Sequence, residues 1–249
     1  MPSGALDSNT EWKKWGEEDP LYGVSTWKDK AKDGASPWTE DEFYNLGRSD
    51  WNDFSRRWKV YGVNLESCLE FGCGAGRMTR QLSEAFQRVY AVDVSEGMIR
   101  RARQAVGANV EFSLIDGIRL PQPDSSVKAV FSTHVLQHLD SIRIGYDIFR
   151  EFHRVLDSGG TLMVHLPLYA FPGNGFRKLG APIYSALGKL SDLRAALNRR
   201  MGRGVMRGIH YPIKELYDFL LDAGFKNVEI DIFPVASNGD LHPFVFATK

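Results

Sequence analysis

Three glycines and one carboxylate are the residues whose types and spacing point most directly to chemistry. Gly72, Gly74 and Gly76 alternate in the stretch Glu-Phe-Gly-Cys-Gly-Ala-Gly. Glycine is needed where the backbone takes a positive φ or lies against a ligand without a Cβ between them. Asp93 follows Gly72 by 21 residues, about where an acidic residue holds the two hydroxyls of a ribose. The spacing therefore predicts a nucleoside site.

The glycine pattern differs from the fingerprint of dinucleotide-binding proteins. In G-x-G-x-x-G the third glycine would fall at position 77, which is Arg77 here. We therefore expect a nucleoside ligand held without the usual pyrophosphate turn, and no useful affinity for NAD.

The elements that must position these residues alternate between strands and helices, which indicates a parallel sheet. A short apolar strand precedes the glycines, and Met78, Leu82, Ala85 and Phe86 then recur at helical spacing. Ser95 is a candidate N-cap for a helix that carries Met98 and Ile99. Further strands are expected at residues 89–92, 110–114, 127–132 and 161–166, and an antiparallel pair at 225–233 and 244–248. Parallel sheets bind ligands at the carboxyl ends of their strands.

Two motifs together resemble the class I S-adenosylmethionine-dependent methyltransferases. They are Glu-x-Gly-x-Gly-x-Gly and the later Val-Asp-Val-Ser-x-x-Met-Ile. The resemblance implies a doubly wound, Rossmann-like α/β fold with helices on both faces of a seven-stranded, mostly parallel sheet. Its expected strand order is 3-2-1-4-5-7-6, with the last strand antiparallel. It covers residues 65–168 and 209–249, and we expect residues 1–249 to form a single methyltransferase domain.

The resemblance also assigns residues to S-adenosylmethionine and to its product, S-adenosylhomocysteine. Asp93 is expected to accept hydrogen bonds from both ribose hydroxyls. Met98 would pack on the adenine, or belong only to the core. Asp116 would accept from the adenine amino group, with Gly117 allowing close approach, or serve only as a turn residue. The other residues expected beside the cofactor are Glu70, Gly72, Cys73, Gly74, Val94 and Thr133.

Two histidines are candidates for the chemical step. Methyl transfer is an in-line displacement, and a hydroxyl acceptor must also lose a proton. His134 and His138 lie in Thr-His-Val-Leu-Gln-His-Leu and would share one face if this stretch were helical. Either one is a candidate base, although a similar motif in the resembled family often only positions the backbone. His210 and His242 are weaker candidates.

No convincing set of metal ligands is apparent in the sequence. The histidine pair lacks the Glu of an HExxH motif. Cys68 and Cys73 are too few for a zinc site or a disulfide scaffold. The sequence predicts a metal-independent enzyme.

Composition bounds the possible partners. The chain has 249 residues, 43% of them hydrophobic, and 31 basic residues balance 31 acidic ones. No global field favours a nucleic acid or a membrane as partner. No signal peptide and no run of about 18 apolar residues is apparent, so a cytoplasmic protein is expected.

Two segments lie outside the resemblance. Residues 1–64 read as polar and irregular, with residues 1–10 disordered, yet they hold all six tryptophans. These rings either pack this cap segment onto the main domain or cover the ligand pocket. Residues 169–208 carry a formal charge of +7 and form either a solvated basic helix or a lid over an anionic acceptor.

The sequence thus predicts methyl transfer to an oxygen or nitrogen atom, rather than a carbon atom, of a small or medium-sized acceptor. The predicted acceptors include anions. Two alternatives stay open. One is an RNA or protein methyltransferase that docks through the basic insertion. The other is a nucleoside-binding module without transferase activity.

Overall fold

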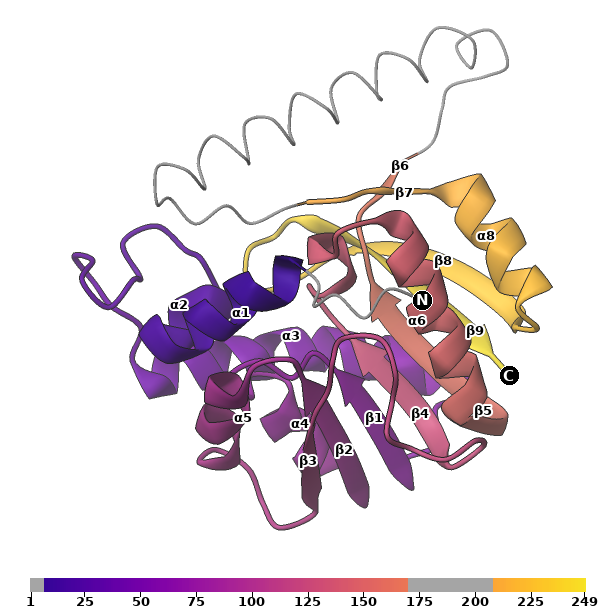
Figure 1. Cartoon of the computed structure of the whole chain (residues 1–249), viewed down its shortest axis with the longest axis horizontal. Coiled ribbons are helices and arrows are strands. Elements are labelled where there is room, and N and C mark those ends of the chain that lie inside the picture. The colour runs from indigo at the N-terminus through magenta and orange to yellow at the C-terminus, as the bar shows by residue number, and fades with distance from the viewer. Residues whose placement is uncertain (1–6, 170–207) are drawn as a thin grey trace, which may run out of the picture.

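The computed structural model describes residues 7–169 and 208–249, and a seven-stranded sheet forms its centre (Figure 1). The strands follow the order β3-β2-β1-β4-β5-β9-β8, which confirms the predicted order. β9 alone runs opposite to the other six strands, antiparallel to both β5 and β8. The strands are β1 (Ser67–Phe71), β2 (Arg88–Asp93), β3 (Val110–Leu114), β4 (Val127–Ser132), β5 (Leu156–His165), β8 (Lys226–Pro234) and β9 (Leu241–Thr248).

The strand order of the sheet switches direction between β1 and β4. Strands β1, β2 and β3 progress one way, whereas β4 and β5 lie on the other side of β1. At such a switch the loops after the two central strands diverge and leave a crevice. All five residues of β1 are buried, so this crevice is built on the most enclosed strand of the sheet.

Helices cover both faces of the sheet (Figure 1). On one face, α6 (Ile142–Val155) and α8 (Ile213–Asp222) pack apolar side chains such as Phe149 and Leu216 against Leu69 and Val130. On the other, α3 (Glu40–Tyr61) and α4 (Thr79–Ala85) pack against Cys68 and Ala129. The remaining elements are α1 (Asp7–Glu18), α2 (Pro20–Val24), α5 (Glu96–Arg103), a 3-10 turn (Leu136–His138) and a small parallel pair, β6 (Leu168–Tyr169) with β7 (Tyr211–Pro212).

The expectation that residues 1–64 are irregular is wrong, because α1, α2 and α3 lie within them. Residues 7–10, expected to be disordered, belong to α1. Helix α3 starts with a capping box in which Thr39 and Glu42 satisfy each other's backbone amides. Its buried face carries Phe54 and Trp58, and the Trp58 indole donates to Thr161 Oγ1 of β5 at 3.0 Å.

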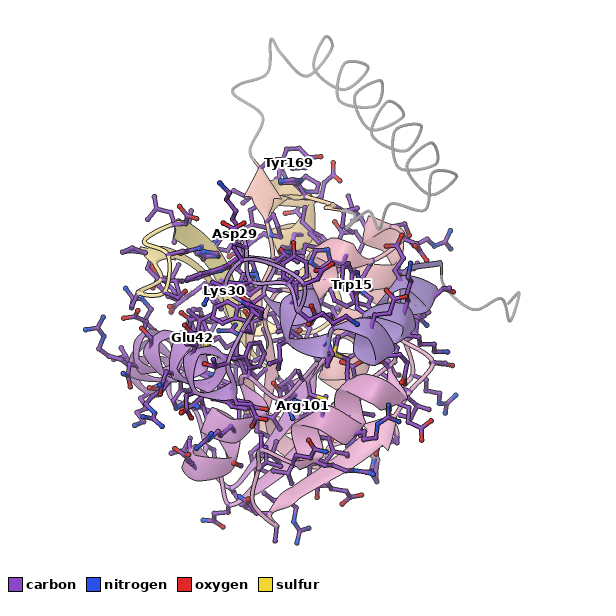
Figure 2. The ribbon with its side chains drawn as sticks, turned by 90° about the vertical axis from the view of Figure 1, so that its left-hand side faces the viewer. Trp15, Asp29, Lys30, Glu42, Arg101 and Tyr169 are labelled. Atoms are coloured by element: carbon purple, nitrogen blue, oxygen red, sulfur yellow. The ribbon has the colours of Figure 1, made fainter. Side chains whose placement is uncertain are left out.

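Helix α1 docks on α5 through two glycines. A Cβ on Gly16 would lie 2.1 Å from Ser95 Oγ, and a Cβ on Gly97 would lie 2.5 Å from the Gly16 carbonyl oxygen. Only glycine permits so close an approach of two helices. Farther along, Arg101 of α5 pairs with Glu40 of α3 at 2.7 Å. Lys30 pairs with Glu42 at 3.0 Å within the N-terminal segment, and Arg101, Lys30 and Glu42 are labelled on the face that Figure 2 presents. The N-terminal helices are therefore attached to the sheet domain at several points.

The basic insertion and the lid hypothesis fall almost entirely on residues 170–207, which lie outside the described residues. Within residues 7–169 and 208–249, no helix combines the length and apolar character required to cross a bilayer.

Candidate active site

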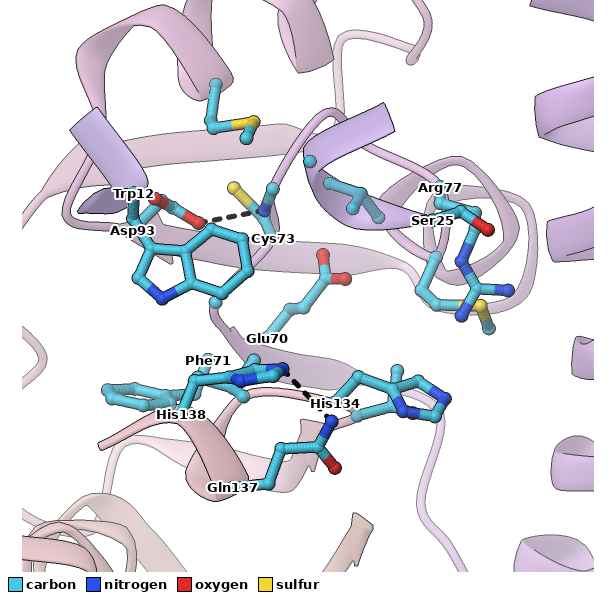
Figure 3. Close-up of a pocket in the computed structure, with 18 of the residues that line it drawn as sticks. Trp12, Ser25, Glu70, Phe71, Cys73, Arg77, Asp93, His134, Gln137 and His138 are labelled. Carbon is cyan, nitrogen blue, oxygen red and sulfur yellow. Dashed lines mark hydrogen bonds between the residues drawn. The ribbon is translucent and has the colours of Figure 1, made fainter. Parts of the chain in front are cut away.

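A cavity of about 300 Å³ opens at the carboxyl ends of β1, β2 and β4 (Figure 3). Its floor is the glycine turn, and α1 and α2 contribute walls through Trp12 and Val24. Asn9 Nδ2 donates to the Asp116 carbonyl oxygen at 2.7 Å, so α1 is tied to the loop after β3. The cavity therefore belongs jointly to the sheet and to the N-terminal helices.

The glycine turn has the backbone conformation that its composition predicts. Gly72, Gly74 and Gly76 have φ values of 78°, 51° and 88°. These left-handed conformations favour glycine, and they allow the chain to fold back over the end of β2. The Gly72 and Cys73 amides both donate to the Val92 carbonyl oxygen, at 2.9 and 3.0 Å.

Asp93 lies at the end of β2 with its carboxylate at the cavity wall, only 7% exposed. One oxygen accepts from the Gly74 amide at 2.8 Å and the other from the Ser95 amide at 2.9 Å. Burial raises the pKa of Asp93, and these amides act in the opposite direction. Each carboxylate oxygen has a further lone pair. Asp93 can therefore accept two more hydrogen bonds, the number that a ribose diol donates.

Glu70 lies deeper in the cavity, in the middle of Figure 3, and is only 2% exposed. Its Oε2 has no hydrogen-bond partner. Burial raises the pKa of Glu70 to about 8; the nearby Thr79 hydroxyl, which makes no hydrogen bond of normal geometry, acts against this, and the charge of Asp93 adds to it. A buried carboxyl with an unused oxygen is costly unless a ligand satisfies it. Glu70 is therefore suited to an ammonium or another strong hydrogen-bond donor.

The structure brings most of the other expected cofactor residues to this cavity. Cys73, Val94, Met98, Gly117 and Thr133 all line it. Met98 is also 1% exposed and packs in the small apolar cluster below α1 and α2. Thr133 Oγ1 is buried without a hydrogen-bond partner.

Asp116 is placed differently, because its side chain is exposed and does not line the cavity. Its Oδ1 accepts from the amides of Ile118 and Arg119, at 3.2 and 3.3 Å. In this conformation the carboxylate closes its own turn. The geometry gives no support to an adenine contact by this side chain.

An ion pair between Asp50 of α3 and Arg77 after the glycine turn lines the cavity, and sequence reasoning did not find it. Both side chains are buried, Asp50 being 3% and Arg77 6% exposed. Asp50 Oδ1 has no partner. The position of Arg77 after the third glycine was visible in the sequence, but nothing local indicated that Asp50 would lie beside it.

The two histidines expected to share a helical face do not, because the stretch is not an α-helix. His134 has a φ of 58°, and only residues 136–138 form a 3-10 turn. The His138 ring packs edge-on against Trp12, with centroids 5.2 Å apart. Both histidines line the cavity.

His134 instead meets His165, the last residue of β5, and His242 of β9. Ring centroids of His134 and His165 are 4.3 Å apart, and His165 Nε2 lies 3.2 Å from His242 Nδ1. Burial lowers the pKa of all three imidazoles, that of His165 to about 3. At neutral pH they are uncharged. His134 and His242 line the cavity, and His165 lies behind them.

Comparison with known proteins places this site in a class. Residues 69–164 match the family model of a methyltransferase domain. The sheet order, glycine turn and Asp93 agree with that match, so residues 69–164 are similar to the methyltransferase domains of the class I, S-adenosylmethionine-dependent type. This confirms the resemblance seen in the sequence.

Individual proteins similar to the chain support the same class. An uncharacterised methyltransferase of Geobacillus sp. (strain WCH70) is 30% identical over 95 residues, 38% of this chain and 44% of that protein. A malonyl-[acyl-carrier protein] O-methyltransferase of Serratia marcescens is 33% identical over 98 residues, 39% of this chain and 37% of that protein. The match thus spans less than half the length of these curated relatives.

Among solved structures, the magnesium protoporphyrin IX methyltransferase of Synechocystis PCC 6803 with bound S-adenosylhomocysteine has a similar fold. Its TM-score is 0.60 at 18% identity, and the alignment covers 98% of this chain and 100% of that one. At this identity the likeness concerns the fold.

Proposed function

We propose that the protein is an enzyme that transfers a methyl group from S-adenosylmethionine to a small or medium-sized acceptor, at oxygen or nitrogen. The observation that carries the proposal is a pair of unused acceptor groups in one cavity. Asp93 has lone pairs free at the end of β2, and Glu70 has a buried, unpartnered oxygen nearby. A ligand with a diol at one end and an ammonium at the other satisfies both.

S-Adenosylmethionine is such a ligand, and when bound it supplies a methyl group already activated by a sulfonium. The protein mainly binds and aligns. Asp93 holds the ribose, Glu70 and the amides of the glycine turn hold the amino acid portion, and Met98 lines the adenine side. Residues 1–64 serve as a cap, since Trp12 and Val24 enclose the same cavity.

The other end of the cavity is proposed to receive the acceptor. Asp50, Arg77, His134 and His242 line it. Neither ring nitrogen of His134 makes a hydrogen bond to a described residue, and burial keeps this imidazole neutral. A neutral imidazole beside the acceptor can take the proton of a hydroxyl or an amine. A cavity walled by two helices favours a small acceptor, or a small group on a larger carrier.

The first experiment is calorimetric titration with S-adenosylmethionine, S-adenosylhomocysteine and NAD. We expect the first two to bind and NAD not to. Turnover is then measured with radiolabelled S-adenosylmethionine and a panel of carboxylic acids, phenols, alcohols and amines. Binding of neither sulfur nucleoside would refute the proposal. Tight binding with no transfer to any acceptor class would favour a nucleoside-binding module instead.

A further inference from the structure

We propose that His134, His165 and His242 form a binding site for one divalent transition-metal ion of the zinc, cobalt or nickel class, with its open position facing the acceptor end of the cavity. The three residues follow β4, end β5 and lie in β9. The antiparallel register pairs His165 with Phe244, which brings His242, two residues away on the same face, beside His165.

The distances fit a site that closes around an ion. One nitrogen from each ring lies within 4.8 Å of the other two. Zinc–imidazole bonds of about 2.0–2.1 Å place two tetrahedral ligands about 3.3–3.4 Å apart. The 3.2 Å hydrogen bond between His165 Nε2 and His242 Nδ1 is close to that length. An ion would replace this hydrogen bond, and His165 would then carry its proton on Nδ1 and give up the 3.4 Å hydrogen bond that Nδ1 accepts from the His134 amide. The third ring must approach by up to roughly 1.5 Å, the difference between 4.8 Å and the tetrahedral spacing, and a side-chain rotation can supply this movement.

The ligand set selects the kind of ion. Three imidazoles without a carboxylate or a thiolate suit zinc, cobalt, nickel or copper, whereas magnesium and calcium require oxygen ligands. Asp50 and Arg77 at the same end form an ion pair, so together they add no net charge that would repel a cation.

The backbone of His134 supports a functional reason for this arrangement. A φ of 58° is uncommon for a residue other than glycine, although histidine adopts it more often than most residues, and such a conformation persists where the surrounding structure imposes it. The strained turn places the His134 ring over His165 at 4.3 Å between centroids.

Two of the three rings line the cavity while His165 is buried, so the fourth coordination position opens toward the ligand space. Three protein ligands with one open position are the arrangement of zinc sites that bind a water or a substrate atom. The methyl donor needs no such ion. The ion would hold an oxygen or nitrogen atom of the acceptor. With the ion bound, the His134 lone pair is used as a ligand, so this role replaces the proton transfer to His134 described above, and it rests on the proposed function.

The test uses the untagged full-length protein, stripped with EDTA and dialysed. Cobalt(II) is titrated and followed by its visible absorption, and zinc is then added to displace it. We expect one equivalent to bind with a tetrahedral spectrum. His242→Ala, the half-exposed member, should weaken binding by more than about tenfold, the loss seen even for supporting residues of metal sites. His210→Ala removes an exposed imidazole outside the cluster and should change nothing.

Binding of S-adenosylhomocysteine is measured on every variant, which shows that each is folded and tests the proposed function separately. No stoichiometric cobalt binding by a protein that binds the nucleoside would overturn the metal site. Cobalt binding that the His242→Ala substitution leaves unchanged would also overturn the metal site. In that case the 3.2 Å contact is a plain hydrogen bond between two neutral imidazoles.

Discussion

Glu70 should release a proton when the cofactor binds. In the free protein its pKa is about 8, because the carboxyl is buried beside Asp93. At pH 7 only about a tenth of the molecules then carry an ionised Glu70. An ammonium placed against the unpartnered Oε2 stabilises the ionised form and lowers its pKa. Binding at pH 7 should therefore release about 0.9 proton, following from that pKa.

The same linkage sets the pH dependence of affinity. Below pH 8 each binding event must remove the Glu70 proton, so affinity should rise with pH. Between pH 6 and pH 7 we expect about a tenfold gain for S-adenosylhomocysteine, or about 1.4 kcal/mol. The gain flattens as the pH reaches the pKa of free Glu70, about 8.

Glu70→Gln keeps the shape and removes the titration. A hydrogen bond to a charged group contributes about 1.5–3 kcal/mol, and ionising Glu70 at pH 7 costs about 1.4 kcal/mol of that. The variant should thus lose only about 0–1.6 kcal/mol at pH 7, more at higher pH, and its affinity should lack the steep slope.

Calorimetry in phosphate and in Tris at one pH measures the released protons, because the two buffers differ in ionisation enthalpy. The number of protons released by the Glu70→Gln variant is subtracted, which removes the contribution of any other titrating group in the cavity. Tight binding by the wild type without proton release, or an equal slope in the variant, would refute the pairing of Glu70 with the ammonium.

Three further predictions follow from contacts around the site. Asp93→Ala should weaken the binding of S-adenosylhomocysteine by about 1.5–3 kcal/mol in calorimetry, while Asp222→Ala, at an exposed position, should not. Equal affinities of the Asp93→Ala variant and the wild type would remove Asp93 from the site. Gly76→Ala combines a φ of 88° with a Cβ 2.9 Å from the Ala102 backbone, so urea unfolding should show a loss of about 2–4 kcal/mol. Gly159→Ala, with φ 74° and no atom within 4 Å of the new Cβ, should lose only about 1 kcal/mol of unfolding free energy. Similar losses in the two variants would contradict the contact between a Cβ at position 76 and Ala102. The affinity for S-adenosylhomocysteine should be unchanged by EDTA, because the residues proposed to bind the nucleoside need no metal ion. A loss of affinity with EDTA that zinc restores would disprove this.

The sheet could be predicted because its signals are local and mutually consistent. Residues 127–132 were expected as a strand and form β4 at the same bounds, and Ser95 caps α5 as its position indicated. The glycine turn and Asp93 are fixed by short sequence separations, so their spacing carried over to the structure.

Helix α3 shows a signal that was present but not used. Its capping box and the recurrence of Phe43, Phe54 and Trp58 at helical spacing are visible in the sequence. The tryptophans were weighed only as packing or covering groups, and both interpretations hold for different rings. Trp58 is fully buried against the sheet, while Trp12 and Trp27 line the cavity.

The histidine cluster could not be predicted in the same way. His134 and His138 are close in sequence, but a strained turn separates their rings. His165 and His242 come together only through the register between β5 and β9, which no local pattern encodes. The same holds for Asp50, which reaches Arg77 from a helix 27 residues earlier in the chain.

These placements divide the site into two parts with different origins. The nucleoside end is built from residues 70–117, inside the segment that matches the methyltransferase family. The opposite end draws on Asp50, His165 and His242, and all three lie outside that segment. The shared methyl donor constrains the residues of the nucleoside end, whereas the acceptor constrains the residues of the opposite end. Acceptor choice should therefore change with substitutions at Asp50 or His242 that leave nucleoside affinity intact, because neither residue contacts the glycine turn or Asp93 in the described structure.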